Sequence, residues 1–267
     1  MISLWRTEWL KLRRLRPFWV VFWLYPLSLG GLLSIALWAE SKAVSMAKSV
    51  GQALPGDLPF AFPTVWQSVA YLASWLHLIP ALLLVLHVTN EFTFRSHRQN
   101  LLDGWSRWQF LLAKLLVALS LSLFCTLTCL VMAVIGGLST GSQPGLQGIS
   151  YLGLFLLQLM VYQAFALLCA FIIRRGTLAL AAFSLYAMML ENIAGFFLNR
   201  WLPGYGSYLP LELAGGLLPI PYLWENAPEA AQALLSGPPW HAVFAGSLLY
   251  LGLLVTLIWL RFRREDL

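Results

Sequence analysis

Charged residues are scarce in this chain of 267 residues: they make up 10%, against 60% for hydrophobic residues. A soluble domain carries about 25% charged residues, so the composition indicates a polytopic membrane protein instead. The net charge of +6 does not indicate binding to nucleic acid. The basic residues cluster in short segments at the ends of apolar runs, which is a signal of membrane topology.

The chain also lacks the residues that several kinds of site require. Its three cysteines, Cys125, Cys129 and Cys169, all lie inside apolar runs without metal-binding companions, so we predict small core residues and no disulfide. No glycine-rich loop ends in Gly-Lys-Ser or Gly-Lys-Thr, so the chain cannot bind ATP by that route. We therefore predict no cofactor in this chain.

Six apolar runs are long enough to cross a bilayer, for which a helix needs about 20 residues. They predict an all-α membrane protein with a single transmembrane domain over residues 1–267. Residues 39–63 are polar and proline-rich, which predicts a loop, and residues 199–238 predict an outer hairpin or short re-entrant helices. The six predicted spans are residues 18–38, 64–88, 107–138, 149–173, 177–198 and 241–260.

An even number of spans places both termini on the same side of the membrane. The basic residues are distributed fourteen to three between the two sides, so the positive-inside rule predicts cytoplasmic termini. The minority on the outer side comprises Lys42, Lys48 and Arg200. The cytoplasmic set is Arg6, Lys11, Arg13, Arg14, Arg16, Arg95, Arg98, Arg107, Lys114, Arg174, Arg175, Arg261, Arg263 and Arg264.

Residues 1–16 have the pattern of an amphipathic helix that lies in the membrane interface. A plain positive-inside anchor is the alternative. Glu8 intrudes on the apolar side, where one helical turn brings it near Lys11. The apolar side carries Leu4, Trp5, Trp9, Leu12 and Leu15, and the basic side carries Arg6, Lys11, Arg13 and Arg14.

A long polar run, residues 89–114, separates the second predicted span from the third. Ser96 and Gln99 fit a capping box, and Gly104 fits a left-handed helix end. A second capping box, Ser106 with Gln109, opens the third span. We therefore predict a short cytoplasmic helix at residues 97–103, with an ordinary solvated loop as the alternative. Because the third span is longer than a bilayer requires, its first two turns should project from the membrane.

Ionisable residues inside predicted spans are candidates for function because they are costly at depth. His77 lies in the second span and Glu191 in the fifth, where Asn192 could donate a hydrogen bond to it or to a neighbour. An intramembrane hydrolase using His77 or Glu191 is one alternative function. Ser139 lies in a Gly-x-Ser-x-Gly match, but at the outer edge of a span, where a simple turn is the better interpretation. An accessory membrane scaffold is another alternative.

The polar run resembles the cytoplasmic loop of ABC-2 type ABC transporter permeases. The resemblance is carried by Asn90-Glu91-Phe92, by the segment 98–102 (Arg-Gln-Asn-Leu-Leu), and by Gly104, Ser106-Arg107 and Lys114. The opening Glu8-x-x-Lys11-Leu12-Arg13-Arg14 is also similar to the N-terminal helix of that family. The arrangement of six spans matches over nearly the whole chain.

The resemblance implies the membrane-spanning permease subunit of an exporter in a bacterial cytoplasmic (inner) membrane. The chain would not be an enzyme itself: a partner ABC ATPase would bind ATP and Mg²⁺, and a second permease subunit would complete a homodimer or heterodimer. Residues 97–103 would be the coupling helix. The residues implied in coupling are Glu91, Arg95, Arg98, Leu101, Leu102, Gly104 and Arg107.

Further expectations concern individual side chains. Glu91, at the cytoplasmic end of the second span, is a candidate partner for Arg95 or for the basic N-terminal helix. His77, Glu191 and Asn192 are candidates for the transport pathway. For His77 a hydrogen-bonded core histidine is the favoured interpretation, and for Glu191 a structural role is the alternative. With only His77 and Glu191 counted as ionisable in the spans, we expect a pathway poor in charge that suits an amphipathic or lipid-like substrate.

Overall fold

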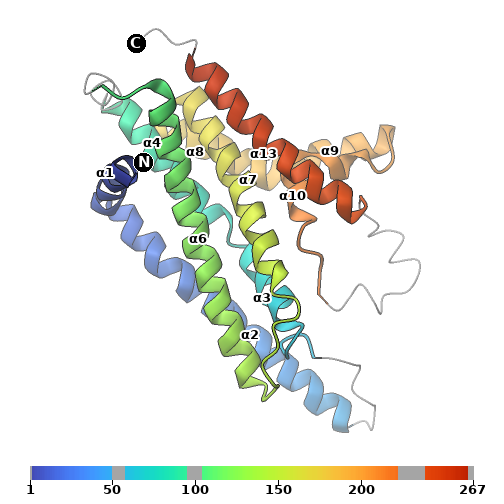
Figure 1. The fold of residues 1–267 in the computed structure, drawn as a ribbon. Helices are drawn as coiled ribbons and strands as arrows, with labels where there is room; N and C mark the ends of the chain where they lie inside the picture. Colours follow the sequence, from blue (N-terminus) through green and yellow to red (C-terminus); the bar gives the residue numbers. More distant parts are fainter. Residues whose placement is uncertain (1, 50–57, 95–103, 222–237, 264–267) are drawn as a thin grey trace.

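The computed structural model describes residues 2–49, 58–94, 104–221 and 238–263, and throughout these ranges the regular structure is helical (Figure 1). The all-helical fold class is thereby confirmed. The principal helices are α1 (Ile2–Arg14), α2 (Arg16–Ser49), α3 (Val65–Ser74), α4 (Leu78–Thr93), α6 (Arg107–Ser139), α7 (Ser150–Ile173), α8 (Gly176–Leu185), α9 (Glu191–Trp201), α10 (Pro210–Gly215) and α13 (Trp240–Arg263).

Five helical segments in these ranges are long and apolar enough to cross a membrane. They are α2, α6, α7, the run Gly176–Trp201 and α13. A sixth is obtained if α3 and α4 together form one bent span. By length and composition the chain is therefore a multi-pass membrane protein, and the predicted boundaries of the third, fourth and sixth spans agree with α6, α7 and α13 to within a few residues.

The predicted loop at residues 39–63 is wrong in its first part, because α2 continues as helix to Ser49. Residues 39–49 contain neither proline nor glycine, so nothing in them breaks the helix. The hydroxyls of Ser41, Ser45 and Ser49 each donate to the carbonyl oxygen three residues back. The polar character of this stretch thus reflects the surface of a long helix.

The second predicted span is not one continuous helix. It is divided into α3 and α4, which are bent by 44° at their junction, and α4 extends beyond the predicted end to Thr93. Pro80 explains the break: it has no backbone N–H for the carbonyl of Leu76, and its ring crowds that carbonyl. The Ile79 amide donates to Leu76 O at 3.1 Å, which tightens the chain at this point.

The helical segment that corresponds to the fifth predicted span runs from Gly176 to Trp201. It therefore begins one residue before the predicted start and ends three residues after the predicted end. It includes a π-helical turn, Tyr186–Leu190, between α8 and α9. Beyond it, α10 packs against α7 and α13, so the expectation of short helices packed on the bundle holds for this part of the segment 199–238. Residues 222–237 lie outside the described part of the chain.

Helix α7 is the centre of the bundle, with contacts to α3, α4, α6, α8, α10 and α13. The start of α1, the end of α4, the start of α6 and the end of α13 lie at one end of the bundle (Figure 1). The end of α2 and the connection from α6 to α7 lie at the opposite end. The two helices next to residues 95–103 therefore share one end of the bundle with α1.

Candidate functional site

A cluster of buried charged side chains lies under α1, where it packs against α4 and α6. Glu8 comes from α1, His87 and Glu91 from α4, and Lys114 from α6. Their exposed fractions are 0% for Glu8, 2% for His87, 5% for Glu91 and 0% for Lys114. Lys11 of α1 completes the cluster at its edge. We refer to these five residues as the ion cluster.

Each carboxylate in the ion cluster contacts both lysines. Lys11 Nζ is 3.0 Å from Glu8 Oε1 and 3.1 Å from Glu91 Oε1. On the other side, Lys114 Nζ contacts Glu8 Oε2 and lies 2.6 Å from Glu91 Oε2. His87 Nε2 is 3.0 Å from Glu8 Oε2. The two ammonium groups therefore bridge two carboxylates that belong to different helices.

Local helical geometry explains how these side chains meet. Glu8 lies between Leu4 and Leu12 at steps of four residues, so all three share the buried face of α1. His87 and Glu91 are also four residues apart, which places them on one face of α4. The apolar neighbours Leu12, Phe92 and Phe110 belong to one core cluster. The packing of this core fixes the depth at which the charges are held.

The electrostatics of the ion cluster favour the ionised form of the Glu8 carboxyl. Burial acts to raise the pKa of the Glu8 carboxyl, but Lys114, His87 and Lys11 together hold it well below its usual range. Burial also acts to lower the pKa of the Lys11 ammonium, and the carboxylates of Glu91 and Glu8 outweigh it and raise that pKa. With two carboxylates and two ammonium groups, the charges of the four acidic and basic side chains balance.

Such a cluster joins helices firmly, and it is sensitive to loss of any member. Removing one partner of a buried ion pair costs about 3–5 kcal/mol, because the other charge is left buried without compensation. Glu8 faces groups on α4 and α6 at once, so movement of either helix away from α1 would expose or strand a charge. The ion cluster is therefore expected to make α1, α4 and α6 move together at this end of the bundle.

Three members also have the composition of a metal site. Glu8, His87 and Glu91 each offer a ligand atom, and these atoms lie within 4.8 Å of one another. The same carboxylate oxygens, however, are within ion-pair distance of Lys114 and Lys11. The Lys114 ammonium thus takes the position between the two carboxylates that a cation would need, so these residues fit a metal ion poorly.

Further contacts near the ion cluster reach the ends of other helices. Lys11 Nζ lies 5.8 Å from the centre of the Trp105 ring, just before α6 begins. Arg107 Nη1 donates to the carbonyl oxygens of Phe262 and Arg263, at 3.3 and 2.5 Å, at the end of α13. A cation is favourable at a helix C-terminus, where carbonyl groups lack partners. Arg107 thus connects the first turn of α6 to α13.

The predictions for the polar run are partly tested. The second capping box is confirmed: the Gln109 amide donates to Ser106 Oγ at 3.1 Å, and the Ser106 amide donates to Gln109 Oε1 at 2.8 Å. Gly104 has φ of +89°, which confirms its left-handed conformation. The predicted helix 97–103 lies outside the described residues, as do four of the predicted coupling residues: Arg95, Arg98, Leu101 and Leu102.

Glu91 was predicted to pair either with Arg95 or with the basic N-terminal helix, and it contacts that helix. Its partner there is Lys11, and the predicted proximity of Glu8 to Lys11 is also confirmed. Lys114 differs from expectation, because it is fully buried rather than exposed on a projecting turn. Burial against α1 explains this difference, since α1 covers the first turns of α6.

Helix α1 has the amphipathic distribution that its sequence predicts. Trp5 and Trp9 stack with ring centres 5.7 Å apart, and Trp5 Nε1 donates to Ser120 Oγ of α6 at 2.8 Å. Arg13 and Arg14 are exposed on the other side. Leu12 is fully buried against the bundle. The helix therefore docks through an apolar face that has one acidic residue, Glu8, at its centre.

The candidate pathway residues each have hydrogen-bond partners of their own. Asn192 does not bond to Glu191 but donates to Met188 O at 3.0 Å. Glu191 Oε1 accepts from the backbone amides of Leu211 and Glu212, at 2.6 and 2.9 Å, and so caps the start of α10. This is a structural role that the sequence did not reveal.

His77 lies at the break between α3 and α4, with its ring 3.8 Å from that of Tyr162, centre to centre, and its Nδ1 against Ser74 O. Ser139 Oγ donates to Gly136 O at 2.7 Å. Among the described residues, therefore, no contact pairs this serine with a histidine, and the hydrolase alternative gains no support from them.

Two members of the ion cluster, His87 and Lys114, were not predicted from the sequence. His87 falls at the end of the predicted second span and was not counted among the buried ionisable residues. Lys114 was counted as a topological charge and as part of the family resemblance, but not as a buried residue. The expectation that His77 and Glu191 are the only ionisable groups in the spans is therefore wrong. A usable signal existed in the four-residue spacing of His87 and Glu91, together with Glu8 on an apolar helix face.

Comparisons with known proteins do not place the chain in a group. No model of a known protein family matches it, and no curated protein does.

Proposed function

We propose that the chain is the membrane-spanning permease subunit of an ABC exporter of the ABC-2 type, working with a separate ATPase subunit. One observation carries the proposal: the ion cluster joins α1 to both α4 and α6, the two helices adjacent to residues 95–103. A subunit driven from outside needs such a rigid junction, so that force applied to one short segment moves several helices together.

In this proposal residues 97–103 form the coupling helix that docks on the ATPase. Closure of two ATPase subunits around ATP would push on this segment and tilt α4 and α6. Because Glu8 is bound to side chains of both helices, α1 would follow them. ATP and Mg²⁺ would be bound by the partner, and this chain would supply the pathway and the helices that change position.

The same proposal assigns the membrane arrangement. The end of the bundle that carries the ion cluster would face the cytoplasm of a bacterial inner membrane, with both termini there and α1 in the interface. A second permease subunit would complete the pathway, as a homodimer or heterodimer. The basic residues near this end support the orientation, since the positive-inside rule predicts it.

The substrate proposed from the sequence is amphipathic or lipid-like. The correction for His87 and Lys114 does not remove its basis, because both side chains are within ion-pair distance of carboxylates in the ion cluster. Ion pathways usually align several available charged groups. Transport of a small inorganic ion in proteoliposomes, with no response to amphipathic compounds, would contradict this part.

The test is assembly with an ATPase. The tagged chain is purified from the cells that make it naturally, copurifying subunits are identified, and ATP hydrolysis is measured in nanodiscs. A P-loop ATPase should copurify, and hydrolysis should require it. Replacing residues 97–103 by a Gly/Ser linker should abolish both binding and stimulated hydrolysis. The matched control replaces residues 143–147, in the α6–α7 connection at the opposite end, and should leave both intact.

Single substitutions in the coupling segment give a graded version of this test. Leu102→Ala and Leu101→Ala should weaken ATPase binding more than Arg98→Ala. Buried apolar anchors usually dominate an interface, and truncating one costs roughly 2 kcal/mol or more, about thirtyfold in affinity. Intact binding and hydrolysis after replacement of the whole segment would refute the proposal, and hydrolytic activity of the chain alone would favour an enzyme.

A further inference from the structure

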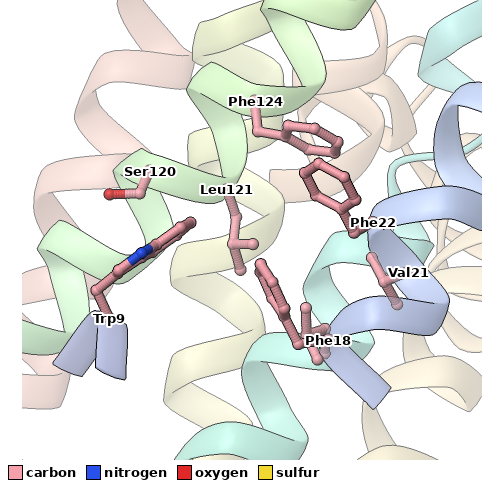
Figure 2. A pocket seen from close by; sticks show the side chains of 8 residues that line it. Trp9, Phe18, Val21, Phe22, Ser120, Leu121 and Phe124 are labelled. Carbon is pink, nitrogen blue, oxygen red and sulfur yellow. The ribbon is translucent and has the colours of Figure 1, made fainter. Parts of the chain in front are cut away.

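A small apolar hollow lies where α1 turns into α2 and both pack against α6 (Figure 2). Its floor is formed by the buried side chains of Phe18, Leu83 and Leu121. Half-buried side chains, including Trp9, Phe22 and Ser120, form its rim. Figure 2 shows aromatic rings from α1, α2 and α6 facing this space.

The chemistry of the hollow favours a hydrocarbon chain over water. The Ser120 hydroxyl is the one polar side-chain group among the lining residues other than the Trp9 ring nitrogen, and it already donates to Leu116 O and accepts from Trp5 Nε1. A water molecule needs two to four polar partners to be held in a cavity, and apolar cavities remain dry. The rim, being only half-buried, leaves the hollow accessible from the surface of the bundle.

The corner between α1 and α2 carries positive charge next to this hollow. Arg13, Arg14 and Arg16 are all exposed. Trp19 Nε1 donates to Arg13 O at 3.1 Å, which holds the corner against the start of α2. Within residues 1–39 the sequence contains one acidic residue, Glu8, and this is buried in the ion cluster. The exposed charge of the corner is therefore basic.

We propose that the hollow binds one acyl chain of an anionic phospholipid, whose phosphate contacts Arg13, Arg14 and Arg16. Arg16 precedes Phe22 by six residues, or about 9 Å along a helix, so the upper part of an acyl chain spans the distance from the arginines to the hollow. Trp5, Trp19 and Trp23, each exposed, flank the corner as residues typical of the headgroup level. The proposal requires only that the chain spans a membrane and does not depend on an ATPase partner.

The other end of α2 provides the comparison that makes this site specific. Lys42 and Lys48 are exposed there too, yet Glu40 lies beside them in the sequence, and no lining residue of the hollow comes from that end. Basic charge alone would attract anionic lipid to both ends. Charge together with an apolar hollow is found at the α1–α2 corner.

Native mass spectrometry tests the proposal on the full chain in detergent. The protein is incubated with equal amounts of phosphatidylglycerol and phosphatidylcholine that carry identical acyl chains. We expect retained phosphatidylglycerol to exceed retained phosphatidylcholine by about tenfold, because several basic residues act on one anionic headgroup. Equal retention of the two lipids overturns the proposal without any variant.

Two variants separate the contributions of charge and hollow. Replacing Arg13, Arg14 and Arg16 together by Gln should reduce the preference to near unity, whereas Lys42→Gln with Lys48→Gln should leave it unchanged. Val21→Trp should fill the hollow and lower total lipid retention severalfold. Its control is Val20→Trp, which adds the same side chain at an exposed neighbouring position that does not line the hollow.

The remaining outcomes are decisive as well. Thermal unfolding of each variant shows whether it is folded, and if Val21→Trp unfolds, Phe22→Trp replaces it in the same assay. An unchanged preference in the triple arginine variant overturns the proposal. If Val21→Trp disrupts a dimer of the chain and leaves lipid retention as it was, the hollow is occupied by a second copy, and the proposal is also overturned.

Discussion

The protein stabilises buried carboxylates in two different ways at two places in the bundle. Under α1, Glu8 and Glu91 are neutralised by Lys11 and Lys114, whose side chains come from α1 and α6. At the start of α9, Glu191 instead accepts hydrogen bonds from the backbone amides at the beginning of α10. Among the described residues, no lysine or arginine forms an ion pair with Glu191.

This difference determines whether a change of charge destabilises the site. It should do so in the ion cluster under α1, and much less at the contact between Glu191 and α10. Side-chain ammonium groups can be removed by substitution, and carboxylates can be protonated, so the ion cluster depends on the charges of its two lysines and two carboxylates. Backbone amides cannot be removed in this way, and an uncharged acceptor can still bind them. We therefore expect charge-removing substitutions to be severe under α1 and mild at α10.

The largest effect is expected for Lys114→Met. The substitution leaves Glu8 and Glu91 buried with Lys11 as their one remaining ammonium partner within the ion cluster, and should cost about 3–5 kcal/mol. The midpoint temperature of thermal unfolding of the purified protein should then fall by roughly 10 °C. Lys48→Met, at an exposed position of α2, is the control and should leave the midpoint unchanged.

A second variant makes this result specific to charge. Adding Glu91→Gln to Lys114→Met removes one of the stranded carboxylates, so the double variant should recover part of the lost stability rather than add to the loss. If the double variant is less stable than Lys114→Met by the full effect of Glu91→Gln, the two residues act independently, and the ion cluster is not the joint described above.

The next effect concerns Glu8→Gln. Gln keeps the shape of the side chain and still accepts a hydrogen bond, but Lys114 retains only the Glu91 carboxylate as an ionic partner. We expect a loss of about 1.5–3 kcal/mol, in the range for a hydrogen bond between charged groups. Limited proteolysis near the N-terminus should show release of α1 from the bundle. Protection equal to that of the wild type would show that apolar packing alone holds α1.

Low pH should remove the stability that the Glu8 carboxylate contributes, without any mutation. The pKa of Glu8 is held below its ordinary value of 4.5 by Lys114, His87 and Lys11, against the effect of burial. A lowered pKa means that the stabilisation is fully present above about pH 4.5 and is lost as pH falls through the lowered value. The stability difference between wild type and Glu8→Gln should therefore stay constant from pH 7 to pH 5 and shrink below that. Lys11, His87, Glu91 and Lys114 all face this carboxyl, so a difference that already shrinks between pH 7 and pH 5 would indicate titration of another group.

A smaller effect is expected at Gly104, which leads into the helix that carries Lys114. Its φ of +89° strains any residue with a Cβ, although nothing lies within 4 Å of that position. Gly104→Val should thus cost about 1–2 kcal/mol through backbone strain rather than through a clash. In the proposed exporter it should also lower stimulated ATP hydrolysis. Gly104→Asn, which tolerates the left-handed region better, is the matched control.

Short-range patterns explain which features the sequence could predict. The capping box at Ser106 and the left-handed Gly104 each depend on neighbouring residues alone, and both are confirmed. Apolar runs located the membrane helices for a similar reason, since length and hydropathy are local properties. The bend at the junction of α3 and α4 was also visible in principle, because Pro80 is in the sequence.

The ion cluster could not be predicted as a whole because its members meet through tertiary packing. Glu8 and Lys114 are separated by more than a hundred residues in the chain, and Lys114 resembles a topological charge when it is considered alone. The role of Glu191 was hidden for the same reason, since its partners are backbone amides of a later helix. Residue type shows that such a group is costly to bury, but only the packing shows what compensates it.

The smallest effect on stability is expected for Glu191→Gln. The amide oxygen of Gln can still accept from the Leu211 and Glu212 amides, so unfolding should change by less than about 1 kcal/mol, whereas the same change at Glu8 costs more. If Glu191 belongs to the transport pathway, for which its sequence position makes it a candidate, its uncharged form should alter transport or substrate preference while the protein stays monodisperse. The control is Glu191→Leu, which removes the acceptor and leaves two amides at the start of α10 without it, so it should be clearly less stable. Comparable instability of Glu191→Gln and Glu191→Leu would mean that the charge itself is structural, and the contrast with the ion cluster would then fail.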